Sequence, residues 1–252
     1  AAVGYWFGGT WGSATDSAFV GRVDGARYLT FLAMVLGGAG TVTALAPSAG
    51  GVVALGADQL GAFAFEIDEQ ARRRWGTVFS SGGRAEVTDA ARRPDGRIAL
   101  VGTGRGTLQI PGLASLGLDA EGDAFVIELE ASGAPRAALE LGDDTSAPAN
   151  PAGLPAHAAL SVVASGDDLV VAGAFAGALA PVDLLPLASS GLDAFLLVLD
   201  AELRPRAARA LGGPGTQWIP SVARAAGGLI VPVNTDGPID GVAHTPVGGI
   251  DV

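Results

Sequence analysis

Apolar and polar residues alternate with a period of two in several short segments of this chain. In the segment DAFVIELE, Phe125, Ile127 and Leu129 fall on one face, and Val126 and Glu128 fall on the other. A period of two is typical of a β-strand, whereas a helix repeats its apolar positions every three to four residues. We therefore predict strands with one buried face and one more polar face.

The alternating segment recurs along the chain, each time around a phenylalanine. The copies read SAFVGRV, GAFAFEI, DAFVIEL and DAFLLVL, and they contain Phe19, Phe63, Phe125 and Phe195. A polar turn follows each copy, then a short apolar segment with a Gly-rich exit, then a strand such as DGRIALVG or DDLVVAG. One unit therefore comprises about four short strands in roughly 45 to 70 residues, the range of propeller blades.

The chain begins and ends inside a unit. AAVGYWFGG at its start is similar to LVVAGAFAG further on, and GGIDV at its end is similar to the start of a fifth copy. We predict one all-β domain over residues 1–252, a β-propeller of four to five units with roughly four strands each. The termini could complete one shared blade, but we favour a larger ring to which this chain contributes only a part.

An uncharged segment lies between Arg27 and Asp58. Its apolar part, YLTFLAMVLGGAGTVTALA, has the length of a membrane span. Gly, Thr and Ser interrupt the apolar run, however, and favour short strands. We predict two buried strands joined by a Gly turn, and no transmembrane segment.

The fullest form of the repeat is similar to a known family. DAF(V/L)xxL(D/E), a following Arg, an LG exit and the strand DLVVAGAF resemble the repeats of bacterial SBBP-type and delta-60-type β-propellers. The similarity spans almost the whole chain and is clearest at Asp123–Gly142, Leu169–Gly177 and Asp193–Gly213. It is lower at Ser13–Gly61, where Gly61 replaces the Asp. Such repeats are common in large surface or secreted proteins, so the resemblance implies an extracellular or cell-envelope location but no activity.

Composition narrows the classes of function. The net charge of −11 disfavours binding to nucleic acid, because phosphates would be repelled. The absence of Cys excludes a disulfide scaffold and thiolate metal sites. We favour a non-enzymatic scaffold that presents its long loops, 142–160 and 181–191, to a protein or glycan partner. The alternatives are a carbohydrate lyase or hydrolase and a structural module of a larger surface assembly.

One acidic segment has the spacing of a calcium loop. LDAEGD places Asp119, Glu121 and Asp123 at alternate positions around a glycine, and calcium prefers oxygen ligands. No bidentate acid follows at the distance that an EF-hand requires, and a solvated acidic turn is the commoner use of such a cluster. Calcium is therefore the one cofactor that the sequence leaves open.

Three further sets of polar residues are interpreted as structural, and no residue is assigned a catalytic role. The recurring aspartates, Asp16, Asp123, Asp193 and Asp251, stand at strand entries, where they can accept bonds from backbone amides. The two histidines, His157 and His244, occur without a HExxH or GxSxG motif and are predicted to be loop residues. The recurring arginines, Arg74, Arg136 and Arg206, are expected to pair across hairpins with acids such as Glu66 and Glu128.

Tryptophans are the candidate binding residues. Trp6 and Trp11 lie near the start of the chain, and Trp218 lies in the segment GTQWIP. Exposed Trp beside Gly and Thr would suit stacking on a sugar or a contact with a protein partner. The alternative is that these rings are buried between blades.

Overall fold

The computed structural model describes residues 5–11, 17–23, 29–142, 154–181 and 184–241. Every secondary-structure element in these ranges is a β-strand, and all strand-to-strand pairings are antiparallel. The described part of the chain contains no helix that could cross a membrane. The all-β class predicted from the alternating pattern is therefore confirmed.

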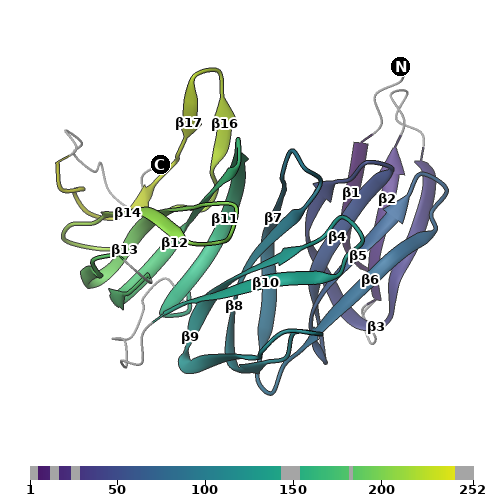
Figure 1. Cartoon of the computed structure of the whole chain (residues 1–252), viewed down its shortest axis with the longest axis horizontal. Coiled ribbons are helices and arrows are strands. Elements are labelled where there is room, and N and C mark those ends of the chain that lie inside the picture. Colours follow the sequence, from purple (N-terminus) through teal and green to yellow (C-terminus); the bar gives the residue numbers. More distant parts are fainter. Residues whose placement is uncertain (1–4, 12–16, 24–28, 143–153, 182–183, 242–252) are drawn as a thin grey trace.

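The strands are arranged in four-stranded units in which each strand pairs with the next one along the chain. Unit B contains the end of β3 (Leu29–Pro47), then β4 (Gly51–Asp58), β5 (Gly61–Asp68) and β6 (Arg73–Ser80). Unit C contains β7 (Ala85–Arg92), β8 (Ile98–Leu108), β9 (Leu116–Leu129) and β10 (Pro135–Leu141). Unit D contains β11 (His157–Ser165), β12 (Asp168–Leu179), β13 (Leu187–Leu199) and β14 (Pro205–Leu211). The units succeed one another across the molecule in chain order (Figure 1).

Unit A precedes these and is continuous with unit B. It contains β1 (Tyr5–Trp11), β2 (Ser17–Val23) and the first part of β3. Through Ala39, β3 pairs with β2, and from Gly40 onward it pairs with β4. The Gly turn predicted between two strands in this segment is therefore wrong: Gly37 and Gly38 lie inside a single strand, which changes its partner instead of reversing.

Unit E follows unit D as one interrupted hairpin, of which the tip projects from the molecule (Figure 1). Its paired segments are β15 (Gln217–Trp218), β16 (Ala223–Ala225), β17 (Gly228–Ile230) and β18 (Asn234–Thr235). β15 pairs with β18, and β16 pairs with β17. Pro220 and Pro232 lie between the paired segments, where the missing N–H of proline prevents a continuous ladder.

The recurring phenylalanines share one structural position, which the alternating pattern did not explain. Each lies directly opposite a glycine of the preceding strand in the antiparallel register. The four pairs are Gly9–Phe19, Gly56–Phe63, Gly102–Phe125 and Gly173–Phe195. In the last three pairs, a Cβ atom on the glycine would lie 2.8, 2.5 and 3.0 Å from the ring of its phenylalanine. The ring thus occupies the space over the glycine, which is why both residues recur together.

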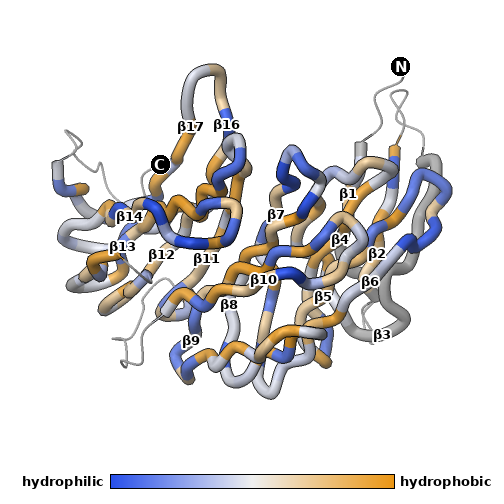
Figure 2. The backbone as a smooth tube through the Cα atoms, in the orientation of Figure 1, coloured by the Kyte–Doolittle hydropathy of each residue, from blue (hydrophilic) through white to orange (hydrophobic). Residues whose placement is uncertain are grey.

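The sheets are buried on both faces because successive units stack on each other. In β9, Phe125, Ile127 and Leu129 pack against unit B, and Ala124 and Val126 pack against unit D. Hydrophobic residues run along the strands, and hydrophilic residues gather at the turns (Figure 2). The predicted polar face is therefore wrong at Glu128 and Asp68, which are 0% and 1% exposed, whereas Glu66 is only partly buried and Glu130 is exposed.

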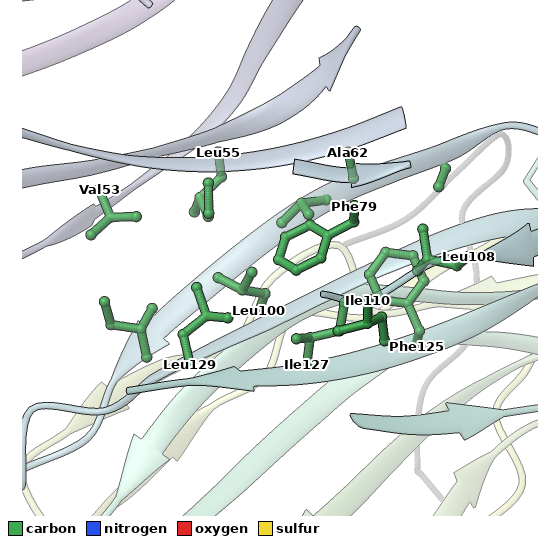
Figure 3. Packing of buried hydrophobic residues seen from close by; sticks show 14 of the residues in the cluster. Val53, Leu55, Ala62, Phe79, Leu100, Leu108, Ile110, Phe125, Ile127 and Leu129 are labelled. Carbon is green, nitrogen blue, oxygen red and sulfur yellow. The ribbon is translucent and has the colours of Figure 1, made fainter. Parts of the chain in front are cut away.

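The core between units B and C shows how the two sheets fit together. Figure 3 shows Leu55 and Phe79 of unit B facing Leu100, Phe125 and Ile127 of unit C. All five side chains are fully buried. Burying a large apolar side chain contributes about 1.5 to 3 kcal/mol, so this interface stabilises both units together.

The first strands of successive units lie against each other. β7 packs against β3 on one side and against β11 on the other. Each of these strands has a register shift at the same place, with Thr43, Thr88 or Leu160 as the extra residue. Thr43 Oγ1 donates to the carbonyl of Val87, and Thr88 Oγ1 lies 2.6 Å from the carbonyl of Ala159. The bulges therefore join one first strand to the next.

Candidate functional site

Two neighbouring cavities open where β7 begins and β8 ends. The first has a volume of about 410 Å³ and the second about 430 Å³. Arg84 and Glu86 line both cavities. The first extends toward unit D, with Leu160 at its wall, and the second extends toward unit B, with Asp58 at its wall. This end of units B and C is the candidate binding site.

Two arginines stand side by side at the first cavity. The amide of Arg105 donates to the carbonyl of Arg84 at 2.7 Å, which extends the β7–β8 ladder one step beyond the pair Ala85–Gly104. Residues that lie directly opposite in a ladder project their side chains from the same face. The side chain of Arg84 is 87% exposed, and its Nη2 atom lies 3.6 Å from Glu86 Oε2. The cavity thus combines two guanidinium groups and one carboxylate.

Hydroxyl groups and an apolar wall complete the first cavity. Thr88 Oγ1 lies 3.1 Å from the carbonyl of Val101, and Thr103 Oγ1 lies 3.2 Å from the carbonyl of His157. Because both hydroxyls donate to backbone, their lone pairs remain able to accept a bond from a ligand. Leu154, Pro155 and Leu160 supply the apolar part of the lining.

The predicted calcium ligands are brought together only in part. The amide of Asp119 donates to Asp123 Oδ2 at 2.6 Å, and the amide of Gly122 donates to Asp119 Oδ1 at 2.7 Å. Among the described residues, the group with metal-ligand geometry consists of Asp119, Asp123 and His157, so Glu121 does not belong to it. The carboxylates cap their own turn, and the third member is a histidine that the sequence spacing did not indicate.

His157 is a strand residue, so its prediction as a loop residue is wrong. It begins β11 and is fully buried. Its Nδ1 atom lies 3.1 Å from Asp123 Oδ1, and its Nε2 atom lies 2.8 Å from the carbonyl of Ala178. Both ring nitrogens thus lie within hydrogen-bond distance of an oxygen atom. The pair connects β9 of unit C to β11 of unit D. His244 lies outside the described residues.

The recurring aspartates that the structure describes, Asp123 and Asp193, are buried in the middle of strands, so their predicted position at strand entries is wrong. Asp193 in β13 corresponds to Asp123 in β9, and it is 6% exposed. Burial raises the pKa of Asp193, although bonds from Ser189 and the Gly213 amide favour its charged form. Asp16 and Asp251 lie outside the described residues. The structural interpretation thus fits the two aspartates that are described.

The tryptophans do not form one exposed surface. Trp6 is partly buried against the core between units A and B, with the guanidinium of Arg22 5.8 Å from its ring centre. Trp218 is partly buried against Ala174, Ala176 and Leu192. Trp11 lies in β1, and the structure does not describe its side chain. The alternative interpretation, packing between units, fits Trp6 and Trp218.

Two of the three recurring arginines pair with an acid across their own hairpin, as predicted. Arg136 Nη1 lies 2.7 Å from Glu128 Oε2. Arg74 pairs with Asp68 of β5, at 3.1 Å, so its partner is this acid and not Glu66 of the same strand. Arg206 pairs with Asp168, at 3.3 Å, which lies on β12 and not on the adjacent β13, so the prediction is wrong for Arg206.

Glu128 is the centre of an ion-pair cluster that the sequence did not reveal. Arg93 Nε lies 2.6 Å from Glu128 Oε1, and Arg97 Nη1 lies 2.7 Å from Glu128 Oε2. The guanidinium of Arg93 also contacts the carbonyls of Asp167 and Asp200 in unit D. The cluster therefore fastens unit C to unit D at the end opposite to the cavities, where the β7–β8 turn lies.

Asp89 ties the first strands of units C and D together. Its Oδ2 atom accepts bonds from Ser161 Oγ at 2.8 Å and from the Val162 amide at 2.9 Å. Ser161 Oγ in turn accepts a bond from the Val222 amide of unit E at 3.0 Å. Burial raises the pKa of Asp89, although the bonds from Val162, Ser161 and the Ala90 amide favour the carboxylate.

The raised pKa predicts how Asp89→Asn changes stability. Because Asp89 ionises at higher pH in the folded state than in the unfolded state, its stabilising contribution is present below the unfolded pKa and is lost as pH rises through the folded pKa. We expect Asp89→Asn to gain stability relative to the parent between about pH 3 and about pH 7, measured by urea unfolding at both pH values.

Asp95→Asn is the control with the opposite sign. Burial acts to raise the pKa of Asp95, but its bonds to Arg97 outweigh this effect and lower it. Its contribution is therefore lost as pH falls, and Asp95→Asn should lose stability relative to the parent as pH rises. Equal pH dependence in the two variants would contradict the role given to Asp89.

Comparison with known proteins leaves the family open. No family model and no curated protein matches the sequence. A protein of unknown function from Bacteroides caccae aligns at 13% identity with a TM-score of 0.48, over 92% of this chain and 65% of that one. Hydrazine synthase from Kuenenia stuttgartiensis aligns at 11% identity with a TM-score of 0.35, over 88% of this chain and 73% of that one. This chain thus spans 65% of the length of the Bacteroides protein, and neither likeness supports an argument about function.

The arginine pair is not apparent from the local sequence pattern, because its members lie on two different strands. Arg84 follows two glycines, and Arg105 stands between Gly104 and Gly106. A signal was available, since both lie at the Gly-rich ends of consecutive predicted strands. Aligning the two strands as a hairpin would have placed the two arginines opposite each other.

Proposed function

We propose that the chain is part of a non-enzymatic β-propeller scaffold that binds a protein or glycan partner at the end where the two cavities open. The observation that carries the proposal is the distribution of charged groups. The acids buried between units hold the sheets together, while Arg84, Glu86 and Arg105 line open cavities. A rigid body with a polar recess at one end suits binding.

The propeller architecture is supported by the order of the strands. Units B, C and D each run from a first strand that contacts the neighbouring first strands to a fourth strand at the other side of the sheet. Units A and E add three strands and an interrupted hairpin. We propose that these units are blades of a larger ring. An extracellular or cell-envelope location is supported by the resemblance of the repeats to surface proteins.

An enzymatic alternative has one observation in its favour. Asp58 and Glu86 both line the second cavity, and a hydrolase or lyase needs two acidic groups at its site. However, Asp58 Oδ1 accepts bonds from the amides of Leu60 and Gly61, at 2.8 and 3.1 Å, and so caps a turn. Asp89 and Asp193, whose pKa values burial raises, line neither of the two cavities. The geometry therefore favours binding.

The proposal is tested by measuring binding and turnover on the same material. The chain is applied to a glycan array and to intact cells of the producing bacterium, and a panel of polysaccharides is assayed for released reducing ends. We expect saturable binding that Arg84→Glu abolishes and Arg224→Glu, in the exposed β16, leaves unchanged. Turnover that Glu86→Gln abolishes would establish the enzyme instead, and a lack of binding would favour a structural module.

A further inference from the structure

The first cavity contains a pair of like charges that the fold itself does not need. Arg84 and Arg105 lie directly opposite each other at the end of the β7–β8 ladder, joined by their backbone bond of 2.7 Å. Like charges at directly opposite positions destabilise a sheet. Within the described residues, Arg105 forms no ion pair that would relieve the repulsion, and Arg84 has only its 3.6 Å contact with Glu86. An anion between the two guanidinium groups would remove this cost.

The local charge indicates the kind of anion. Glu86 is the one acidic residue among the described residues that line the first cavity, so the lining carries two positive charges and one negative charge. A single carboxylate neutralises this excess of one positive charge. A phosphate dianion carries more negative charge than the excess and would be repelled by Glu86. Paired guanidinium groups also match the planar geometry of a carboxylate.

The remaining lining indicates what the carboxylate is attached to. Leu154, Pro155 and Leu160 form an apolar wall beside the arginines, and Thr88 and Thr103 add hydroxyl oxygens. The described residues that line the cavity include no Trp, Tyr or Phe, so they offer no platform on which a sugar ring would stack. Its volume of about 410 Å³ lies in the range of small-molecule sites.

We infer that the cavity binds the carboxylate of a small amphipathic acid between Arg84 and Arg105, with the apolar part of the ligand against Leu154, Pro155 and Leu160. This inference rests on the proposed binding function and names the ligand class for one of the two cavities. The carboxylate can belong to a free organic acid or to the acidic end of a larger partner, because both present the same group.

Hexanoate, hexanamide and acetate are suitable probes for the inference. Titrations followed by calorimetry and by amide NMR shifts should give saturable hexanoate binding. Hexanamide lacks the charge and acetate lacks the apolar part, so both should bind at least about tenfold more weakly. Comparing hexanoate with a short peptide that ends in a free carboxylate distinguishes a free acid from the end of a partner.

Variants assign the binding to the two arginines. Arg84→Gln and Arg105→Gln should each weaken hexanoate binding about tenfold, and Arg224→Gln should leave it unchanged. Because either change relieves the repulsion, neither should lower the midpoint of urea unfolding, which separates lost binding from lost folding.

Three results would overturn the inference: no saturable hexanoate binding, equal binding of hexanoate and hexanamide, or unchanged binding in the double variant Arg84→Gln, Arg105→Gln. The broader proposal is tested separately. If hexanoate fails while the glycan array or cells still bind in an Arg84-dependent way, the carboxylate inference is wrong and the scaffold function stands.

Discussion

Gly102→Ala is expected to lower the free energy of unfolding by about 3 kcal/mol or more, because the new methyl group has no space. A Cβ atom at Gly102 would lie 2.2 Å from the backbone carbonyl of Glu86 and 2.5 Å from Cζ of Phe125. The ring of Phe125 is fixed in the core between units B and C, and the carbonyl belongs to β7. The strand itself must therefore move, and side-chain rotation alone cannot relieve the clash.

Urea unfolding of Gly102→Ala and Gly117→Ala provides the matched comparison. Gly117 is an exposed glycine in β9, and a Cβ atom there would have no heavy atom within 4 Å beyond its chain neighbours. Alanine at this position should be neutral or slightly stabilising, since it only reduces the freedom of the unfolded chain. If both variants unfold at the midpoint of the parent, the Gly–Phe pair is not the constraint that the recurring pattern suggests.

The second large effect is expected at Glu128. Glu128→Gln keeps the shape of the side chain but leaves the buried guanidinium of Arg93, which is 1% exposed, without a counter-ion. Breaking a buried ion pair from one side costs about 3 to 5 kcal/mol, so this variant should unfold at much lower urea concentration. Arg97 and Arg136 also lose their shared partner, but both remain in contact with water and contribute less.

Two further variants show whether the loss arises from the unpaired cation. Glu130→Gln, an exposed carboxylate 3.7 Å from Arg136, should change stability by less than about 1 kcal/mol. Combining Glu128→Gln with Arg93→Met should recover part of the lost stability, because the buried charge is gone. If the double variant is less stable than the sum of its single changes, the cluster does not act as a charge pair.

The secondary structure could be predicted from the sequence because it depends on local pattern. The period of two around Phe63, Phe125 and Phe195 identified the third strand of each four-stranded unit. The burial of both faces could not be predicted in the same way. Glu128 looked like a residue of a polar face, and only the folded structure places Arg93 of the β7–β8 turn beside it and the carbonyls of Asp167 and Asp200 of unit D beside Arg93.

The candidate site depends on contacts between strands, which the local pattern of one strand does not contain. Arg84 and Arg105 meet through a hairpin pairing, and His157 meets Asp123 through contact between two different sheets. Neither contact has a fixed spacing in the chain. The tryptophans were singled out because of their chemistry, yet Trp6 and Trp218 are used for packing.

The polar contacts between first strands have a consequence for the order of the units. The threonine contact occurs at both the B–C and the C–D junctions, but the bond from Ser161 to Asp89 and the pairing of His157 with Asp123 occur at C–D. At the B–C junction, Gly61 stands at the position of Asp123, and Ala85 stands at the position of His157. Each junction thus has polar contacts that are specific to the two units that form it. The units are similar in shape, but a unit moved to another position by recombination would lack the contact residues of its original neighbours. The sequence therefore encodes the order of the repeats as well as their fold.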